Sequence, residues 1–273
     1  MSEESTSLSE ACQLVRTQTG HDFSLYKTPP LLRRMERRIA ITQTLHIEDY
    51  VRYLRHHPVE VELLFREFLI GVTFFFRDAP FFDSLKEKVI GPLLRKNGVT
   101  TVRIWVPGCS TGEEAYSIAI LIRETLDACH SEIEVYILAT DIDLRAIDSA
   151  RAGIYSDNII ADISPERLAR FFSSETGSYR INSDLRNQVV FSGHDLLSDP
   201  PLSGIDLVSC RNLLIYIDDL GQEKILSLFH HSLNPAGYLV LGHSERIGGM
   251  ADFFIDVDKQ WKIYQRNGST RLS

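Results

Sequence analysis

The 273-residue sequence is poor in the features that mark several large classes of protein. Its four cysteines (Cys12, Cys109, Cys129 and Cys210) lie far apart without a CxxC pair, so no disulfide framework is expected. No apolar run approaches the roughly 20 residues that cross a bilayer, and the polar start, residues 1–9, does not resemble a secretion signal. A net charge of −8 argues against general nucleic-acid binding. We therefore expect a cytoplasmic protein with no membrane insertion and no nucleic-acid partner.

What is present is the composition of a globular protein, with 44% hydrophobic and 24% charged residues. Residues 1–72 carry apolar residues at helical spacing and almost no glycine, which predicts an all-helical N-terminal domain. Residues 73–273 alternate short apolar runs with helical patterns, which is typical of a doubly wound α/β domain. A polar interval at about 156–190, with a turn near Gly177, predicts a small inserted β subdomain.

The expected elements of the α/β domain indicate where a ligand would bind, because ligands of such sheets lie beyond the carboxyl ends of the strands. We predict strands at 102–106, 134–139, 189–191, 205–209 and 238–241, and helices at 113–126, 144–151, 165–172 and 220–233. In the first domain we predict helices that begin at Pro29-Pro30 and at Val59.

Residues 103–117 read as a strand, a glycine-bearing turn and the start of a helix, which is the usual geometry for holding a nucleotide-like cofactor. The turn has neither a GxGxxG fingerprint nor a phosphate loop. Instead, Glu113 and Glu114 stand at the helix N-terminus, where they suit the helix dipole and would repel a pyrophosphate. A cofactor with hydroxyls, positive charge and no phosphate fits this turn, and S-adenosylmethionine is such a molecule.

Several residues directly after the predicted strands are candidates for that site. Gly108 lets backbone approach a ligand, and Asp141 can accept hydrogen bonds from both ribose hydroxyls. Asp141 could instead cap the next helix, although Asp143 is better placed for that role. Asp195 could meet the adenine edge or only form a turn. Tyr216 follows the strand at 205–209 beside apolar residues, where a tyrosine is more often part of a core than catalytic.

Five motifs in order resemble the chemotaxis-receptor glutamate methyltransferase (CheR) family over nearly the whole chain. They are Thr73-Phe74-Phe75-Phe76-Arg77-Asp78, the turn and helix at 108–117, Ala139-Thr140-Asp141-Ile142-Asp143, Cys210-Arg211-Asn212 with Tyr216, and Gly242-His243-Ser244-Glu245. The resemblance implies a helical substrate-recognition domain and an S-adenosylmethionine-binding α/β domain with a small β insertion. It also implies methylation of glutamate side chains on the cytoplasmic helical domain of a chemoreceptor, with S-adenosylhomocysteine as the product.

The resemblance also implies roles for individual residues. Arg77 and Tyr216 would flank the transferring methyl group as the catalytic residues. The predicted cofactor-binding residues are Thr73, Arg77, Gly108, Glu114, Asp141, Asp195, Leu196, Arg211 and Asn212. An arginine face on the helix after Pro30 would bind an acidic substrate helix, although such a face can also be merely solvated; it comprises Arg33, Arg34, Arg37 and Arg38. The histidines show no metal-ligand arrangement, so we expect no metal.

The chain departs from the family pattern at three places. Gly71 stands where many relatives have asparagine, and Asp195 stands where some have it. The 173–180 stretch is shorter than in relatives that tether to a receptor's C-terminal peptide, so we predict no tether. The run 26–38 resembles CheR-family proteins that are fused to methylesterase and sensory domains. The substrate of such proteins need not be an ordinary chemoreceptor.

Two other readings stay open at this stage. A cofactor-binding module could signal by docking to a regulatory protein. A nucleic-acid methyltransferase is a weak alternative, because Asp199-Pro200-Pro201-Leu202 lies before its strand and lacks an aromatic residue.

Overall fold

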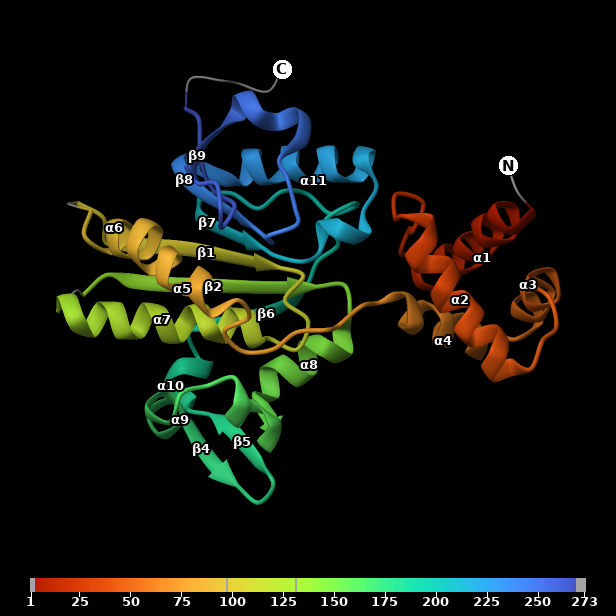
Figure 1. Cartoon of the computed structure of the whole chain (residues 1–273), viewed down its shortest axis with the longest axis horizontal. Coiled ribbons are helices and arrows are strands. Elements are labelled where there is room, and N and C mark those ends of the chain that lie inside the picture. The colour runs from red at the N-terminus through yellow and green to blue at the C-terminus, as the bar shows by residue number, and fades with distance from the viewer. Residues whose placement is uncertain (1–2, 97, 131, 269–273) are drawn as a thin grey trace. The chain divides into compact units, whose positions relative to one another are not determined.

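The computed structural model describes residues 3–96, 98–130 and 132–268 (Figure 1). Its contacts divide the chain into two compact units. The helical unit comprises Met1–Ile70 and Leu214–Lys224, and the sheet unit comprises Gly71–Leu213 and Ile225–Ser273. The chain therefore passes between the units three times. Among the described helices, none is long and apolar enough to cross a membrane.

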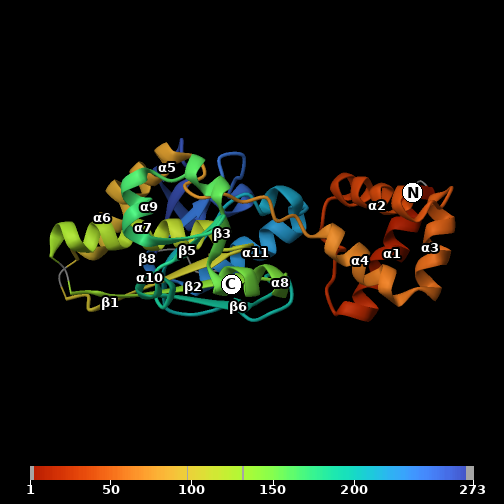
Figure 2. The same cartoon turned by 90° about the horizontal axis from the view of Figure 1, so that it is seen from below.

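The helical unit is built around four helices near the start of the chain (Figure 2). They are α1 (Glu3–Thr19), α2 (Thr28–Thr42), α3 (Ile47–His56) and α4 (Pro58–Phe68). Prolines fix the first turn of α2, as the sequence predicted, and that of α4, whose start was predicted one residue later, at Val59. Helix α1 packs against α3 and α4, and α2 packs against α4, so that Leu31 and Met35 of α2 are buried. The later segment Leu214–Lys224 adds the short helix η3 (Leu214–Tyr216) to this unit.

The sheet unit contains a seven-stranded sheet in the order β6-β2-β1-β7-β8-β10-β9 (Figure 1). The strands are β1 (Thr101–Pro107), β2 (Glu134–Asp141), β6 (Val189–Gly193), β7 (Ile205–Cys210), β8 (Leu233–Leu241), β9 (Phe254–Asp258) and β10 (Ile263–Arg266). The first five are parallel, and β10 runs antiparallel to both β8 and β9. The strand order reverses at β1, between β2 and β7, and this is where α/β sheets of this kind bind ligands. The predicted doubly wound fold class is thus confirmed, with a mixed sheet.

The described helices of the sheet unit include the three predicted at 113–126, 144–151 and 220–233, which lie within three residues of those bounds, and several that the sequence did not predict. They are α5 (Ala79–Leu85), η1 (Lys86–Ile90), α6 (Gly91–Leu94), α7 (Glu113–Cys129), α8 (Leu144–Ala152), α10 (Ser183–Arg186), α11 (Asp219–Ser232) and η4 (Gly248–Phe253), the start of α11 lying in the helical unit. Residues 234–237 separate the predicted helix at 220–233 from the predicted strand at 238–241. They lie inside the bounds of β8, where the pairing with β7 jumps from Leu233 to Tyr238. Those four residues therefore form an excursion from the strand.

A small antiparallel sheet with one helix lies between α8 and β6 in the sequence, where an insertion was predicted. We call residues 154–181 the inserted subdomain; its elements are β3 (Ile154–Ser156), η2 (Asp157–Ala161), α9 (Pro165–Phe171), β4 (Phe172–Glu175) and β5 (Ser178–Ile181). Its strand order is β3-β5-β4, and Gly177, with φ of 73°, makes the hairpin turn between β4 and β5.

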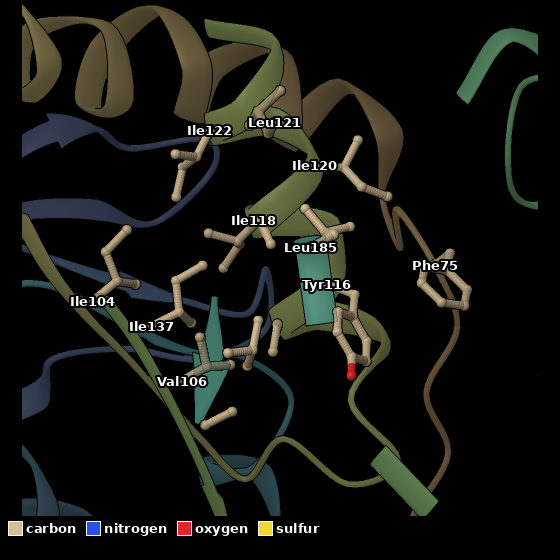
Figure 3. Packing of buried hydrophobic residues seen from close by; sticks show 14 of the residues in the cluster. Phe75, Ile104, Val106, Tyr116, Ile118, Ile120, Leu121, Ile122, Ile137 and Leu185 are labelled. Atoms are coloured by element: carbon tan, nitrogen blue, oxygen red, sulfur yellow. The ribbon is translucent and has the colours of Figure 1, made fainter. Parts of the chain in front are cut away.

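The core of the sheet unit lies between the central strands and α7. Figure 3 shows Ile104, Val106 and Ile137 of the strands facing the helix, which contributes Ile118 and Ile122. All five side chains are at most 2% exposed. Burying a side chain of this size stabilises the fold by about 1.5–3 kcal/mol. This packing holds the carboxyl end of β1 against the N-terminus of α7, which positions the turn between them.

His230 of α11 is a buried polar residue whose neighbours are mainly aromatic. It is 1% exposed, and within the described part of the chain neither ring nitrogen has a hydrogen-bond partner. Its ring lies 5.4 Å from that of Phe253 and 5.7 Å from that of Phe254, centroid to centroid. Burial lowers the pKa of His230 from 6.5 to about 4, and the charge of Arg266 acts in the same direction.

This histidine should make stability depend on pH. Between pH 6.5 and about 4 the unfolded chain binds a proton at this position and the folded chain does not, so the free energy of unfolding falls as the pH falls. We expect His230→Phe to remove about 2 kcal/mol of the stability that wild type loses between pH 7 and pH 5. Urea denaturation at pH 7 and pH 5 measures it, with His231→Phe on the same helix as the control. Equal pH slopes for wild type and His230→Phe would contradict the expectation.

Candidate functional site

The turn between β1 and α7 has an unusual backbone that the sequence accommodates. Gly108, Ser110 and Gly112 have φ of 68°, 48° and 95°. At Gly112 a side chain is excluded twice, because its φ is positive and a Cβ there would lie 2.9 Å from the Cβ of Ala150. Ser110 takes a left-handed conformation although it has a side chain, so other groups must hold it in place.

Asp141, at the end of β2, is one of the groups that hold this turn. Its Oδ2 accepts a hydrogen bond of 2.8 Å from the Ser110 backbone N–H, and its Oδ1 accepts one of 2.9 Å from that of Asp143. Burial raises the pKa of Asp141, and these two hydrogen bonds oppose that shift. A carboxylate oxygen has two lone pairs, so each oxygen can accept a further bond. Asp143 caps α8 by accepting from Arg145 and Ala146 N–H, as predicted.

The two glutamates at the start of α7 have different surroundings. The Glu113 carboxylate accepts from the hydroxyl of Thr111, at 2.9 and 2.7 Å. The Glu114 carboxylate is turned toward the end of β7, where it accepts from the Ser209 hydroxyl at 2.7 Å and from Arg211 Nη1 at 3.5 Å. Burial raises the pKa of Glu114, whereas Arg211 and Ser209 lower it. The two neighbouring glutamates therefore differ in place: Glu113 belongs to the turn, and Glu114 lies at the carboxyl edge of the sheet, where a ligand is expected.

Arg211 connects the carboxyl end of β7 to the segment that carries Arg77. Its side chain is 2% exposed, and Nη2 donates to Asp78 Oδ2 at 2.7 Å and to the Arg77 carbonyl at 2.9 Å. Its guanidinium carbon also lies 4.0 Å from the centroid of the Phe81 ring. The guanidinium is therefore surrounded by protein groups and forms ion pairs with two carboxylates, those of Asp78 and Glu114.

Residues 73–78 form an irregular segment before α5, with a turn at Phe75 and Phe76. Thr73 and Arg77 are half-buried, and Arg77 Nη1 donates to the Val72 carbonyl at 3.2 Å. Phe76 has φ of 50°, and its N–H donates to Ser117 Oγ at 3.0 Å. Gly71 accepts a hydrogen bond from Ser110 Oγ through its carbonyl, at 3.3 Å. The backbone at Gly71 thus contacts the β1–α7 turn.

Sequence reasoning did not assign a role to Glu245, which ties the ends of β7 and β8 together. Glu245 is 3% exposed, and its Oε2 accepts from the backbone N–H of Asn212, at 3.0 Å, and from that of Gly242. A Cβ at Gly242 would lie 2.7 Å from this oxygen, so a side chain there is excluded. The motif Gly242-His243-Ser244-Glu245 was quoted only as a family feature. A buried glutamate is unusual, but burial cannot be read from the motif itself.

Asp195 forms a turn after β6. Its Oδ1 accepts from Leu197 N–H at 2.9 Å, and its own N–H donates to Asp199 Oδ2 at 2.8 Å. The side chain of Asp195 is half-buried, and that of Leu196 is 7% exposed. These contacts fit the turn role that the sequence left open beside the adenine role. In the described ranges, no group of three or more His, Cys, Asp or Glu is arranged to hold a metal ion.

Tyr216 belongs to the helical unit, where its backbone is held by the residue before α2. Lys27 N–H donates to the Tyr216 carbonyl, and Lys27 Nζ donates to the Ile215 carbonyl, both at 2.9 Å. Tyr26 and Ile217 form an antiparallel bridge beside them. The predicted partnership of Tyr216 with Arg77, which lies in the sheet unit, stays a prediction.

The four arginines of α2 do not form one free face. Arg38 is 11% exposed and makes two hydrogen bonds, of 2.9 and 2.8 Å, to Glu60, whose side chain is 7% exposed. Arg34 is half-buried and donates to the Glu67 carbonyl at 3.0 Å. Arg33 and Arg37 are exposed, with Arg37 3.2 Å from the Glu67 carboxylate. The prediction that all four lie together on a recognition face is therefore corrected: Arg38 faces the interior because its partner comes from α4.

Comparison with known proteins identifies the family. Residues 71–263 match the family model described as "CheR methyltransferase, SAM binding domain", and residues 6–69 match "CheR methyltransferase, all-alpha domain". The chain is 33% identical over 254 residues to the chemotaxis protein methyltransferase of Salmonella typhimurium, covering 89% of this chain and 84% of that protein. It is 32% identical over 242 residues to chemotaxis protein methyltransferase 2 of Vibrio cholerae, covering 86% and 84%.

A longer relative is an uncharacterized 104.1 kDa protein of Rhodobacter capsulatus, which is 40% identical over 255 residues. The match covers 92% of this chain and 27% of that protein, so the chain spans about a quarter of that relative's length. The two family models together cover both units from residue 6 to residue 263. The chain therefore belongs to the CheR family of S-adenosylmethionine-dependent methyltransferases.

Proposed function

We propose that this chain transfers a methyl group from S-adenosylmethionine to glutamate side chains on the cytoplasmic helical domain of a chemoreceptor. The products are a glutamate methyl ester and S-adenosylhomocysteine. The observation that carries the proposal is the pair of carboxylates, Asp141 and Glu114, at the reversal point of the sheet, in a chain that matches both family models. The names of the Salmonella and Vibrio relatives support a role in chemotaxis.

The hydrogen-bond donors and acceptors at the carboxyl edge of the parallel strands suit a cofactor that is cationic and has no phosphate. In the proposal, Asp141 accepts from the ribose hydroxyls, and Glu114 attracts the ammonium group at a site where burial weakens competition from water. Gly108 and Thr73 contact the cofactor through the turn and the 73–78 segment. Asn212, Asp195 and Leu196 complete the predicted set of cofactor contacts. For Arg211 we propose an indirect role, because its donors bind Asp78, Glu114 and the Arg77 carbonyl.

The proposed reaction needs no general base. A glutamate side chain has a pKa of about 4.3, so it is ionised at pH 7. Its oxygen attacks the methyl carbon as the carbon–sulfur bond breaks, and the electron pair stays on sulfur. An anion and a cation are thereby converted into a neutral ester and a neutral thioether, and the protein's contribution is chiefly alignment. We assign Arg77 to orienting the carboxylate or Tyr216, because a tight ion pair to the attacking oxygen would weaken it as a nucleophile.

Methylation of a purified chemoreceptor cytoplasmic fragment tests this proposal. The fragment is incubated with the protein and S-adenosylmethionine, and its peptides are analysed by mass spectrometry. We expect a mass increase of one CH₂ on particular glutamates, and no modification when those glutamates are replaced by alanine. Methyl groups found on lysine or arginine would contradict the assignment to carboxylates.

The exposed arginines of α2 offer a test of substrate recognition. The double variant Arg33→Glu/Arg37→Glu should raise the KM for the receptor fragment about tenfold, because two favourable charge contacts with an acidic helix become repulsive. Its affinity for S-adenosylmethionine should not change. The matched control is Arg52→Glu/Arg55→Glu, which reverses two exposed arginines of α3. Equal KM values for the two double variants would refute a recognition role for the α2 arginines.

A protein other than a chemoreceptor is the second candidate substrate. The observation that favours it is the match to part of a 104.1 kDa relative, which agrees with the resemblance to versions fused to further domains. Methylation of a different protein in a lysate of the native host, with no methylation of the receptor fragment, would select this candidate. Cofactor binding without any transfer would select the docking-module alternative.

A further inference from the structure

The inserted subdomain packs against the segment that carries Arg77. Phe75, which is 1% exposed, lies edge-to-face with Tyr155 of β3, at 4.8 Å between ring centroids, and with Phe172 of β4, at 5.5 Å. Figure 3 shows Phe75 on the 73–78 segment, which leads to α5. The Tyr155 hydroxyl also donates to the Thr111 carbonyl at 2.8 Å, in the turn between β1 and α7. One strand of the subdomain thus contacts both segments of the proposed cofactor site.

Arg167 of α9 makes a second contact with the same segment. Its guanidinium carbon lies 4.1 Å from the centroid of the Phe76 ring, a cation–π geometry. Nε and Nη2 donate to the two oxygens of Glu124 on α7, at 2.8 and 3.0 Å, which fixes the plane of the guanidinium. The side chains of Arg167 and Glu124 are 28% and 20% exposed, so this pair is partly shielded from water.

The backbone that Arg167 covers is one that needs external support. Phe76 has φ of 50° and Asp78 has φ of 63°, so Arg77 stands between two residues in the left-handed region. A bulky residue rarely adopts this conformation, and it persists where the surroundings over-determine it. Arg211 holds the segment through the Arg77 carbonyl and Asp78, and Ser117 holds it through the Phe76 N–H. Arg167 holds the ring of Phe76.

We infer that Arg167 is a positioning residue for methyl transfer, through which the inserted subdomain holds Phe76 and thereby aims Arg77. This inference rests on the proposed function for its kinetic part only. It assigns the subdomain a role within the catalytic site itself, in addition to any contact that it makes with a partner. A partner that displaced α9 would then change the rate of transfer.

Hydrogen exchange and kinetics on the full chain test the inference together. In Arg167→Gln, we expect the Phe76 amide to exchange about tenfold faster, because opening of the segment becomes easier. We expect kcat to fall by a similar factor while the KM for the receptor fragment stays within about twofold. Arg167→Lys, which retains a cation over the ring, should recover part of both effects. A purely structural role for the arginine would not produce this division between kcat and KM.

Arg170 provides the matched control on the same helix. It pairs with Asp127 and lies over the Phe171 ring at 4.8 Å, so Arg170→Gln removes an ion pair and a cation–π contact away from the 73–78 segment. Unchanged exchange at Phe76 in Arg167→Gln, faster exchange with unchanged kcat, or equal effects in the two variants would overturn the inference. If wild type methylates no receptor fragment, the proposed function fails. Exchange of the Phe76 amide in wild type and in Arg167→Gln, measured with and without S-adenosylmethionine, still decides whether Arg167 holds the segment.

Discussion

Arg77→Ala should lower kcat for methyl transfer by about a hundredfold or more, with the fold unchanged. The side chain is half-buried, and its one described hydrogen bond within the protein goes to the Val72 carbonyl, so its removal leaves no buried charge unpaired. The rate should fall because an orienting contact near the reacting carboxylate is lost, and small errors of alignment cost large factors in rate. Initial rates with labelled S-adenosylmethionine measure the effect.

Arg145→Ala, which removes an exposed arginine of α8, serves as the control for Arg77→Ala. It should retain the wild-type rate, and both variants should keep the wild-type circular dichroism spectrum. Near-wild-type turnover by Arg77→Ala would refute the orienting role.

The largest effect on stability is expected for Arg38→Ala in the helical unit. Removing this arginine leaves the carboxylate of Glu60 buried, with the Tyr50 hydroxyl at 2.7 Å as its remaining described side-chain partner. Breaking one side of a buried ion pair destabilises a fold by about 3–5 kcal/mol. Burial and the neighbouring Glu60 also raise the pKa of Tyr50, so the tyrosine remains a neutral hydrogen-bond donor and supplies no charge to replace that of Arg38.

Loss of helical circular dichroism in urea measures this effect, because the two tryptophans, Trp105 and Trp261, lie in the sheet unit and do not report on the helical unit. Arg33→Ala is the matched control on the same helix, and it should change the free energy of unfolding by less than about 0.5 kcal/mol. Equal stability of the two variants would show that the Arg38–Glu60 pair contributes nothing.

Local patterns in the sequence predicted the parts of the fold that local forces determine. The glycines of the 108–112 turn, the cap at Asp143 and the proline start of α2 depend on residues within a few positions of one another. The alternation of strands and helices was sufficient for the fold class. The strands β9 and β10 were missed because they are short and antiparallel, and their pairing with β8 has no local signature.

The parts that were not predicted depend on partners far away in the sequence. Periodicity placed Arg38 on a polar face, but its burial follows from Glu60 on another helix. The contact between Lys27 and Ile215 joins positions 188 residues apart, and it places the Tyr216 segment in the helical unit. The chemistry of the β1–α7 turn pointed to S-adenosylmethionine, whereas the glutamate substrate came from the family resemblance alone.

Release of methanol by mild alkali tests the central claim, carboxyl methylation, most directly. Lysate of the native host lacking this protein is incubated with S-adenosylmethionine labelled in the methyl group, and wild type is compared with Tyr216→Phe. Methyl esters hydrolyse in alkali, whereas methylated nitrogen does not. The account predicts protein-bound label that alkali releases as volatile methanol and that falls sharply in Tyr216→Phe. Label that resists alkali, or equal label with both proteins, would contradict it.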